Sequence, residues 1–297
     1  MNIFAGVNTA LVTPFLDGKI DFSSVKKILS CQLDSGINGI VVGGSTGEGI
    51  MLNDLEYRDL LDFVIKFVKG RIKVFASCTS ITTSHCVLLA KVAQDLGVDA
   101  VMCAPSPYVR ASQAGIVKHF RFLHDSIGIP IILYSVPQRI GVDFNDESIV
   151  EIALMPRVSA FKDAGSDLQR ILRITQLLPE DKLNFLCGND ADFLAFSVNG
   201  GSGCISVASN AVPRSMVSLY HLILEERYSQ ALLQHRVMMN LYKILCIENN
   251  PAALKYVLFL MGLCSEETRP PLMQLLENNK IIIKDAVENL KQSLKLE

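Results

Sequence analysis

Residues 39–48 have the sequence Gly-Ile-Val-Val-Gly-Gly-Ser-Thr-Gly-Glu, and this stretch shows how the whole chain is built. The run Gly39–Gly43 is short and apolar on both faces, as a parallel strand covered by helices should be. Asn53 and Glu56 follow with the spacing of a capping box, which predicts the start of an amphipathic helix. The stretch therefore indicates a strand, a loop that carries polar residues, and a helix.

The same unit recurs along the chain. Seven further short apolar runs are predicted strands: 8–13, 72–77, 100–104, 130–135, 158–162, 184–188 and 203–207. The amphipathic runs between the strands are predicted helices, beginning at Asp21 and Asn53 and then spanning 82–96, 112–126, 145–154, 167–178, 190–198 and 213–225. Eight strand–helix units in series predict an α/β fold, a (β/α)₈ TIM barrel, with an open doubly wound sheet as the alternative.

No strand pattern recurs after about residue 226. Three further segments are predicted helices: 228–247, 251–261 and 280–294. Pro270-Pro271 breaks the chain between the last two of them. We expect residues 1–225 to form the barrel and residues 226–297 to form a C-terminal helical region packed on it.

The composition excludes several classes of protein. Hydrophobic residues make up 49% of the 297 positions, enough to bury a sizeable core. A formal charge of −2 gives no sign of nucleic-acid binding. No secretory signal is visible at the N-terminus, and the apolar run Tyr256–Cys264 is about half the length that spans a bilayer. We expect a cytoplasmic protein with neither a nucleic-acid nor a membrane partner.

The eight cysteines contain no Cys-x-x-Cys pair, and several of them lie inside apolar runs. This pattern predicts reduced, buried thiols of a cytosolic protein, with neither a zinc site nor a disulfide framework. The five histidines all fall in predicted helices, and His119 and His124 are five residues apart, which places them poorly on one helix face. We therefore predict no metal site.

Catalytic residues of such a barrel lie where the strands end, on the loops that lead into the helices. Lys162 ends the strand-like run Val158-Ser159-Ala160-Phe161. Alternation along a strand would place Val158, Ala160 and Lys162 on one face. If that face points inward, desolvation favours a neutral amine, which can attack a carbonyl carbon. A solvated lysine at the end of a strand fits the spacing equally well.

Other strand ends carry further candidates. Tyr134 and Tyr108 could relay a proton, or could simply pack at a loop. Ser45 and Thr46 lie among glycines and could bind a small carboxylate, or could form an ordinary turn. Arg139 could bind a carboxylate in bidentate fashion, or could form a surface ion pair.

Together these residues resemble the pyruvate-dependent class I aldolase superfamily, which includes dihydrodipicolinate synthase and N-acetylneuraminate lyase. The matching motifs are Thr9–Phe15, Gly44-Ser45-Thr46-Gly47-Glu48, Tyr134 with Val136-Pro137, Lys162, Gly188-Asn189-Asp190, and Asn250-Pro251 with Lys255. Within the superfamily the chain is most similar to the synthase family, because Arg139 stands two residues after the proline. The resemblance implies a lyase that condenses pyruvate with L-aspartate 4-semialdehyde to 4-hydroxy-tetrahydrodipicolinate, for lysine or diaminopimelate biosynthesis.

The resemblance also implies roles for the catalytic residues. Lys162 would form a Schiff base with pyruvate, and Tyr134 would shuttle protons. Ser45 and Tyr108 would complete a hydroxyl relay to Tyr134, with Tyr108 supplied by the neighbouring subunit of a homotetramer built as a dimer of dimers. No metal or organic cofactor would be needed, because the imine itself accepts the electrons.

Substrate-binding roles follow from the same resemblance. Ser45 and Thr46 would hold the carboxylate of pyruvate, and Arg139 would hold the carboxylate of the semialdehyde. Backbone groups of Gly188 and Ile205 would line the pocket beside Lys162.

The chain departs from the family pattern at a few positions. The family usually has threonine at position 45, asparagine at 135, threonine at 140 and glutamate at 163, where this chain has Ser45, Ser135, Ile140 and Asp163. Three further positions, those around the feedback site of lysine-inhibited members, hold Tyr57, His85 and Pro107. We therefore expect weak or no inhibition by lysine.

Two other activities remain open at this point. One is a different Schiff-base aldolase, acting on a 2-keto-3-deoxy sugar acid or on N-acetylneuraminate. The other is a non-catalytic or phosphate-binding barrel. The run Gly200-Gly201-Ser202-Gly203 could suggest a phosphate site, but it precedes the last strand and so belongs to the opposite face of the barrel.

Overall fold

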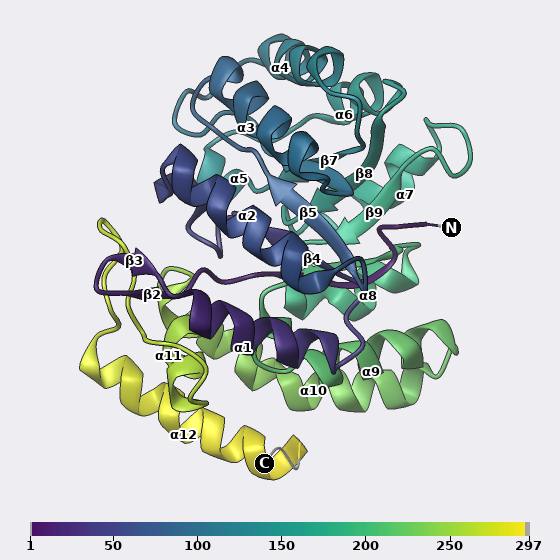
Figure 1. Ribbon diagram of the computed structural model, residues 1–297. Helices are drawn as coiled ribbons and strands as arrows, with labels where there is room; N and C mark the ends of the chain where they lie inside the picture. The colour runs from purple at the N-terminus through teal and green to yellow at the C-terminus, as the bar shows by residue number, and fades with distance from the viewer. Residues whose placement is uncertain (1, 295–297) are drawn as a thin grey trace.

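The computed structural model describes residues 2–294 and shows a closed parallel β-barrel surrounded by helices (Figure 1). The barrel strands are β1 (Gly6–Ala10), β4 (Gly39–Val42), β5 (Lys73–Ser77), β6 (Ala100–Cys103), β7 (Ile131–Ser135), β8 (Val158–Asp163), β9 (Asn184–Cys187) and β10 (Gly203–Ser206). β1 pairs with both β4 and β10, so the sheet has no free edge. The predicted TIM barrel is therefore confirmed, and the open doubly wound sheet was the wrong alternative.

Helices follow the strands and cover the outside of the barrel (Figure 1). They are α1 (Phe22–Leu33), α2 (Asp54–Val68), α3 (Thr83–Leu96), α4 (Gln113–Ser126), α6 (Asp146–Ala153), α7 (Arg170–Thr175), α8 (Phe193–Val198) and α9 (Pro213–Leu224). The predicted capping box at the start of α2 is present, since Asn53 and Glu56 bond to each other's backbone N–H groups. Short turns, η1 (Gly49–Met51), α5 (Pro137–Ile140), η2 (Asp190–Asp192) and η3 (Ala208–Asn210), lie in the loops.

Several local features differ from the prediction, including β1, which was predicted over 8–13 and spans Gly6–Ala10. A small hairpin of β2 (Phe15–Leu16) and β3 (Lys19–Ile20) precedes α1. Its turn, Asp17-Gly18, has positive φ at both residues, the conformation that Asp-Gly favours in a two-residue hairpin. α7 is shorter than the predicted helix over 167–178, and the chain leaves it before Pro179.

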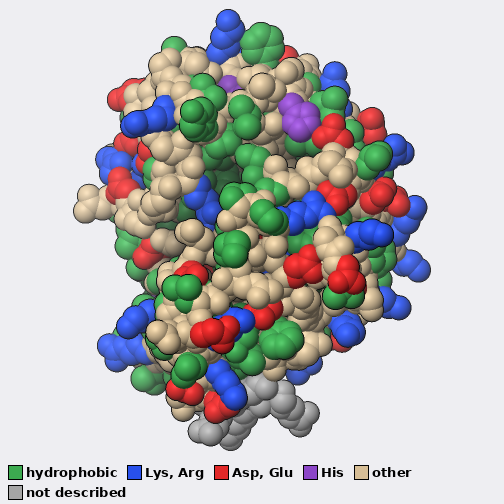
Figure 2. All heavy atoms as spheres, turned by 90° about the vertical axis from the view of Figure 1, so that its left-hand side faces the viewer, with side chains coloured by type: hydrophobic (Ala, Val, Ile, Leu, Met, Phe, Trp, Pro, Cys, Tyr) green, Lys and Arg blue, Asp and Glu red, His purple; other side chains and the backbone are tan. Residues whose placement is uncertain are grey.

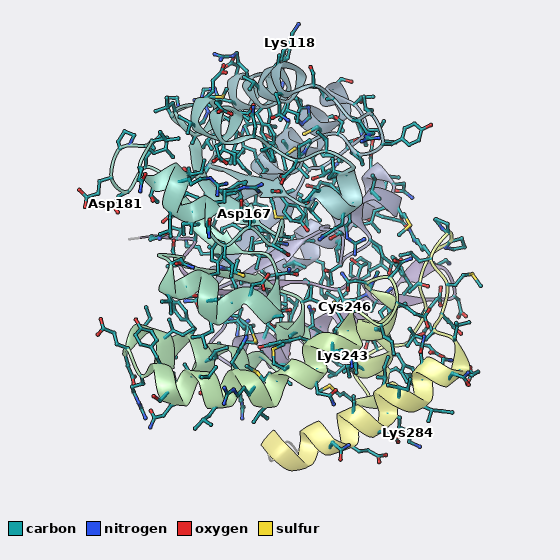
Figure 3. The ribbon with its side chains drawn as sticks, turned by 180° about the vertical axis from the view of Figure 1, so that it is seen from behind. Lys118, Asp167, Asp181, Lys243, Cys246 and Lys284 are labelled. Carbon is teal, nitrogen blue, oxygen red and sulfur yellow. The ribbon has the colours of Figure 1, made fainter. Side chains whose placement is uncertain are left out.

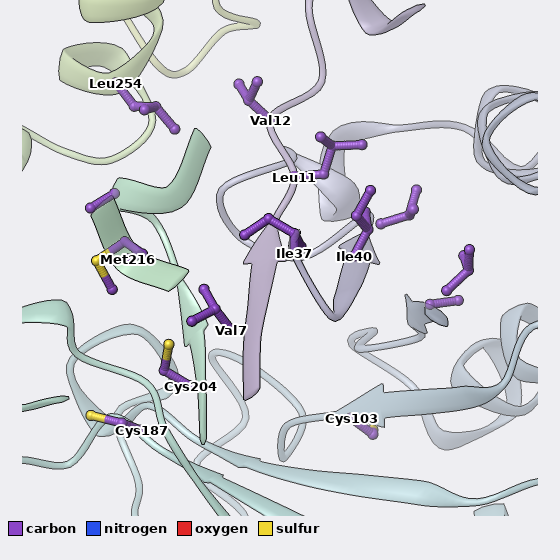
Figure 4. Packing of buried hydrophobic residues seen from close by; sticks show 14 of the residues in the cluster. Val7, Leu11, Val12, Ile37, Ile40, Cys103, Cys187, Cys204, Met216 and Leu254 are labelled. Atoms are coloured by element: carbon purple, nitrogen blue, oxygen red, sulfur yellow. The ribbon is translucent and has the colours of Figure 1, made fainter. Parts of the chain in front are cut away.

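The core has two parts, because each strand has one face inside the barrel and one against the helices. Figure 4 shows the outer part, where Val7 and Ile40 lie on strands and Met216 comes from a helix. The inner part includes Phe75, Met102, Ile132, Leu186 and Ile205. Packed side chains therefore fill the barrel below its mouth.

The alternation predicted for β8 is only partly correct. Ala160 belongs to the inner cluster, but Val158 and Phe161 belong to the outer one. Val158 pairs with Ile131 and Ala160 with Ile132, so Ser159 is an extra residue, a bulge in the ladder. The bulge turns Val158 outward and leaves Ala160 and Lys162 on the inner side.

After the barrel come α10 (Tyr228–Leu245), α11 (Ala252–Leu260) and α12 (Glu277–Leu294). α10 packs on α8 and α9, and α12 packs on α10 and α11 (Figure 1). Figure 3 shows Cys246 at the end of α10, on the side of that helix that approaches the barrel. Within residues 2–294, none of the helices combines the length and the apolar character needed to cross a bilayer.

Candidate active site

A cavity of about 220 Å³ lies at the carboxyl ends of the strands. Figure 2 views the face towards which β5 points in Figure 1, and it shows a hollow bordered by hydrophobic and basic side chains. The cavity brings together six of the eight residues singled out in the sequence: Ser45, Thr46, Tyr134, Arg139, Lys162 and Gly188. Strands far apart in the chain thus place the candidate residues around one space.

Lys162 and Tyr134 form the centre of this site. They are register partners on the neighbouring strands β8 and β7. The Nζ atom of Lys162 lies 4.1 Å from the centre of the Tyr134 ring, and only 4% of the lysine is exposed. The prediction that Lys162 points inward is confirmed, and the alternative of a lysine exposed at the end of a strand is wrong. A buried amine beside a phenol is suited to nucleophilic attack on a carbonyl with local proton transfer.

Asp190, at the end of β9, is a functional candidate that sequence reasoning did not select. Its Oδ2 atom accepts hydrogen bonds from the backbone N–H groups of Val207 (3.0 Å) and Ala208 (2.8 Å). Its Oδ1 atom is buried and makes no hydrogen bond of good geometry with the described residues. Burial raises the pKa of the Asp190 carboxyl, while its hydrogen bonds and the charge of Lys162 counteract that rise. The motif Gly188-Asn189-Asp190 was the available signal.

Asn250, which follows α10, connects the C-terminal helices to the site. Its side-chain amide donates to Oγ1 of Thr46 at 2.9 Å, and its backbone carbonyl accepts a hydrogen bond from Nη2 of Arg139 at 3.2 Å. The C-terminal region therefore helps to orient two of the predicted substrate-binding residues.

The loop after β4 that carries Ser45 and Thr46 is tightly folded. Glu48 adopts the left-handed conformation with φ of 54°. A Cβ atom at Gly49 would lie 1.7 Å from the carbonyl oxygen of Gly43, so this position requires glycine. The glycines of the motif thus allow a compact turn that points Ser45 and Thr46 at the cavity.

A buried ion pair between Glu48 and Lys255 anchors the same loop to α11. Both side chains are completely buried. Lys255 Nζ also donates to the carbonyl of Glu267 at 2.7 Å and lies 4.2 Å from the centre of the Phe15 ring, while Glu48 Oε2 accepts from the backbone N–H of Arg269 at 2.9 Å. Burial lowers the pKa of the Lys255 ammonium, and Glu48 counteracts that shift. This pair joins the barrel mouth to the C-terminal helices.

Ser135 and Asp163, which differ from the residues usual in the family, belong to one network of hydrogen bonds and ion pairs. Ser135 donates to Oδ1 of Asp143 at 2.6 Å. The buried guanidinium of Arg170 lies 2.6 Å from Asp143 and 3.3 Å from Asp163. Burial raises the pKa of the Asp163 carboxyl, and Arg170 counteracts that rise. The network braces the strand ends beside Lys162 and Tyr134.

Tyr108 and Ile205 do not reach the cavity within this chain. Tyr108 is 93% exposed, with φ of 71°, and does not line the cavity. Ile205 is fully buried in the inner cluster and is not a lining residue either. Gly188 does line the cavity, but its backbone N–H is already bonded to the carbonyl of Asp163 at 2.7 Å.

A second cavity, of about 300 Å³, adjoins the first. Ser45, Tyr134, Arg139 and Asn250 line both cavities. The shared lining makes the two cavities neighbouring compartments of one barrel mouth, with room for two small reactants.

Comparison with known proteins identifies relatives along nearly the entire chain. Residues 3–290 match the model of the "Dihydrodipicolinate synthetase family". The 4-hydroxy-tetrahydrodipicolinate synthase of Rickettsia bellii (strain OSU 85-389) is 42% identical over 97% of this chain and 98% of the relative. The structure of the 4-hydroxy-tetrahydrodipicolinate synthase of Methylacidiphilum fumariolicum SolV superposes with a TM-score of 0.96 at 34% identity, over 98% of this chain and 97% of the other. The structure of DHDPS from Cyanidioschyzon merolae with lysine bound has a TM-score of 0.94 at 28% identity, over 98% and 99% of the two chains.

Proposed function

The chain belongs to the dihydrodipicolinate synthetase family, and from this premise we propose that its reaction takes place at Lys162. The activity is that of a lyase, 4-hydroxy-tetrahydrodipicolinate synthase, which condenses pyruvate with L-aspartate 4-semialdehyde in lysine and diaminopimelate biosynthesis. The relatives therefore favour the first of the three activities that the sequence left open.

The observation that carries the assignment of Lys162 is its buried amine beside the ring of Tyr134. The neutral amine attacks the C2 carbonyl of pyruvate, and loss of water gives the protonated Schiff base. Removal of a proton from C3 then gives the enamine, whose carbon attacks the aldehyde of the second substrate. The amino group of that substrate displaces Lys162 on cyclisation and frees the enzyme. Tyr134 serves as the proton shuttle in these steps.

The polar residues of the mouth divide between the two substrates. Backbone N–H and hydroxyl groups of Ser45 and Thr46 bind the carboxylate of pyruvate, supported by the hydrogen bond from Asn250 to Thr46. Arg139, which lines both compartments, binds the carboxylate of the semialdehyde. Gly188 lines the pocket beside Lys162, whereas Ile205 belongs to the packed core of the barrel and has no direct contact with the cavity.

Chemical trapping tests this assignment directly. The protein is incubated with pyruvate, reduced with borohydride and analysed by intact mass and peptide mapping. A reduced pyruvyl adduct confined to Lys162 is the expected result. A folded protein without an adduct, or with an adduct on another lysine, contradicts the assignment.

Substitution Arg139→Ala should mainly weaken use of the semialdehyde. Loss of a charged hydrogen-bonding partner costs roughly 1.5–3 kcal/mol, so KM for the semialdehyde should rise by about 10- to 100-fold. Steady-state kinetics with each substrate varied in turn measure the effect, and KM for pyruvate serves as the internal control. An unchanged KM for the semialdehyde would show that Arg139 does not bind it.

We infer a homotetramer built as a dimer of dimers from the family, and the position of Tyr108 supports the contact between the two subunits of one dimer. Tyr108 is almost fully exposed, and Val109, Ile50 and Ile81 are also exposed apolar residues of the loops at the mouth. A second copy of the chain packed on these loops would bury them and bring Tyr108 to the relay through Ser45 and Tyr134.

Mixing two inactive variants tests whether Tyr108 acts across the subunit boundary. We expect Lys162→Ala and Tyr108→Phe each to lose most activity alone. After subunit exchange, mixed dimers contain one site with both Lys162 and the partner's intact Tyr108, so roughly a quarter of wild-type activity should return. No recovery in dimers that mass spectrometry shows to be mixed would exclude this role for Tyr108.

Weak or absent inhibition by lysine is also expected. His85 is bonded through one ring nitrogen to Asp54 and through the other to Ser80, both at 2.8 Å. A histidine has no carboxylate that could bind the ammonium groups of lysine, and both of its ring nitrogens already have partners. Pro107 has no hydroxyl that could bind the effector. Initial rates measured over a lysine titration test this expectation, and half-inhibition at submillimolar lysine would contradict it.

A cytoplasmic location fits these features. None of the eight cysteines is in a disulfide, and the cytoplasm keeps thiols reduced. The prediction that all these thiols are buried is wrong for Cys31 in α1 and for Cys246 at the end of α10, which are exposed.

A further inference from the structure

Three cysteines and a histidine that are scattered in the sequence meet behind the barrel wall. Cys78 directly follows β5, Cys86 lies in the first turns of α3, and Cys103 ends β6. His119 projects from α4 towards them. The three cysteines are completely buried and His119 is 6% exposed. Cys187 and Cys204, two other buried cysteines, lie well away from Cys103 in Figure 4.

The distances within this group suit a metal ion. The Sγ atom of Cys86 lies 3.4 Å from that of Cys103 and 3.7 Å from that of Cys78, and all three sulfurs are within 4.8 Å of one another. Nε2 of His119 adjoins the triplet, 3.4 Å from the sulfur of Cys103. Zinc held tetrahedrally at about 2.3 Å from sulfur separates two sulfur ligands by roughly 3.8 Å. The triplet is therefore already close to the spacing that zinc requires.

The surroundings match those of a metal centre as well. Nδ1 of His119 is hydrogen-bonded to Oγ1 of Thr83 at 2.9 Å, which orients the ring and leaves Nε2 facing the sulfurs. The hydroxyl of Tyr57 is buried and has no hydrogen-bonding partner among the described residues. Burial raises the pKa of this phenol, and the charges of Cys78, Cys86 and Cys103 raise it further, so the phenol lies within electrostatic range of the triplet.

In contrast to the expectation from the sequence that the chain has no metal site, we propose that Cys78, Cys86 and Cys103, with His119 as the fourth donor, form a buried structural site for a thiophilic divalent metal ion, and that the ion is zinc. Binding releases the three thiol protons to solvent, and zinc undergoes no change of oxidation state. Thiols of Cys103 and Cys78 that now point at backbone carbonyls would turn to the metal. The ion would join β5, β6, α3 and α4 beneath the loops that carry Thr79 and Tyr108.

Metal analysis of the full-length protein tests the site without reference to activity. The protein is produced in zinc-supplemented medium, purified without chelators and analysed by mass spectrometry of its metals. We expect about one zinc per chain. Variants Cys86→Ser and Cys103→Ser should lose it, whereas Cys264→Ala, which removes a buried cysteine elsewhere, should retain it. A metal-free wild-type protein, or zinc retained by both serine variants, would overturn the proposal.

Cobalt substitution covers the case in which the serine variants fail to fold. Wild-type protein is unfolded under reducing conditions and refolded with Co²⁺, and the near-ultraviolet band from sulfur-to-cobalt charge transfer is recorded. A strong band whose position changes in the His119→Asn variant supports a site with three thiolate ligands and one imidazole ligand. The absence of a band rules out the thiolate site, and an unshifted band in His119→Asn rules out the fourth donor. A Cys86–Cys103 disulfide, detected as the loss of two hydrogens from the intact mass, would also contradict the proposal.

Discussion

Replacement of Lys162 by alanine should reduce kcat for the condensation by at least about 10⁴-fold. The substitution removes the amine that forms the Schiff base, and no other amine in the described structure lines the cavity around it. The fold should survive, because the side chain ends at the cavity and the backbone of β8 remains paired with β7 and β9. Steady-state assays of semialdehyde consumption measure the rate, and circular dichroism tests whether the variant is folded.

The Tyr134→Phe variant is the control with which the loss of kcat in Lys162→Ala is compared. It keeps the ring over Lys162 but removes the hydroxyl, so kcat should fall by about 10²- to 10⁴-fold. The phenylalanine variant should still accumulate the trapped pyruvate adduct slowly, whereas the alanine variant should form none. If Lys162→Ala retained more than a hundredth of wild-type kcat, covalent catalysis at this residue would be excluded.

Replacement of Lys255 by methionine should destabilise the protein by about 3–5 kcal/mol, a large share of the free energy of unfolding of a typical domain. The methionine fills a similar volume, but it leaves the carboxylate of Glu48 buried without its cation. Because Glu48 belongs to the loop of Ser45 and Thr46, we expect KM for pyruvate to rise as well. Urea unfolding at fixed protein concentration, followed by circular dichroism, measures the change in stability.

The double variant Glu48→Gln, Lys255→Met separates the buried charge from packing. Burial lowers the pKa of Lys255 despite the nearby Glu48, so the cost of desolvating the ammonium exceeds what the pair returns. Replacing both charges should therefore recover most of the lost stability. A double variant as unstable as Lys255→Met would show that packing around the methionine, and not the unpaired carboxylate, causes the loss.

Much of the fold could be predicted because parallel strands have a local signature. Each barrel strand is a short run buried on both faces, and helix caps such as Asn53 lie within three residues of their partners. The predicted strand over 158–162 is correct to within one residue, as is its end at Lys162. The bulge at Ser159 could not be predicted because it depends on how β8 pairs with β7. The alternation of residues within a single strand carries no information about that pairing.

By itself, the sequence determined the serial order of strand–helix units, the strand-end position of Lys162 and Tyr134, and a family resemblance that the comparisons support. Closure of the sheet into a barrel was established by the pairing of β1 with both β4 and β10. Only the tertiary structure decided which distant residues meet. Four groups of residues join different elements in this way. They are Asp190 with Lys162, Glu48 with Lys255, Arg170 with two carboxylates, and Cys78, Cys86 and Cys103 with His119. The physical reason is that periodicity records which face of an element is buried, whereas contacts between elements depend on register, bulges and the packing of helices on the barrel.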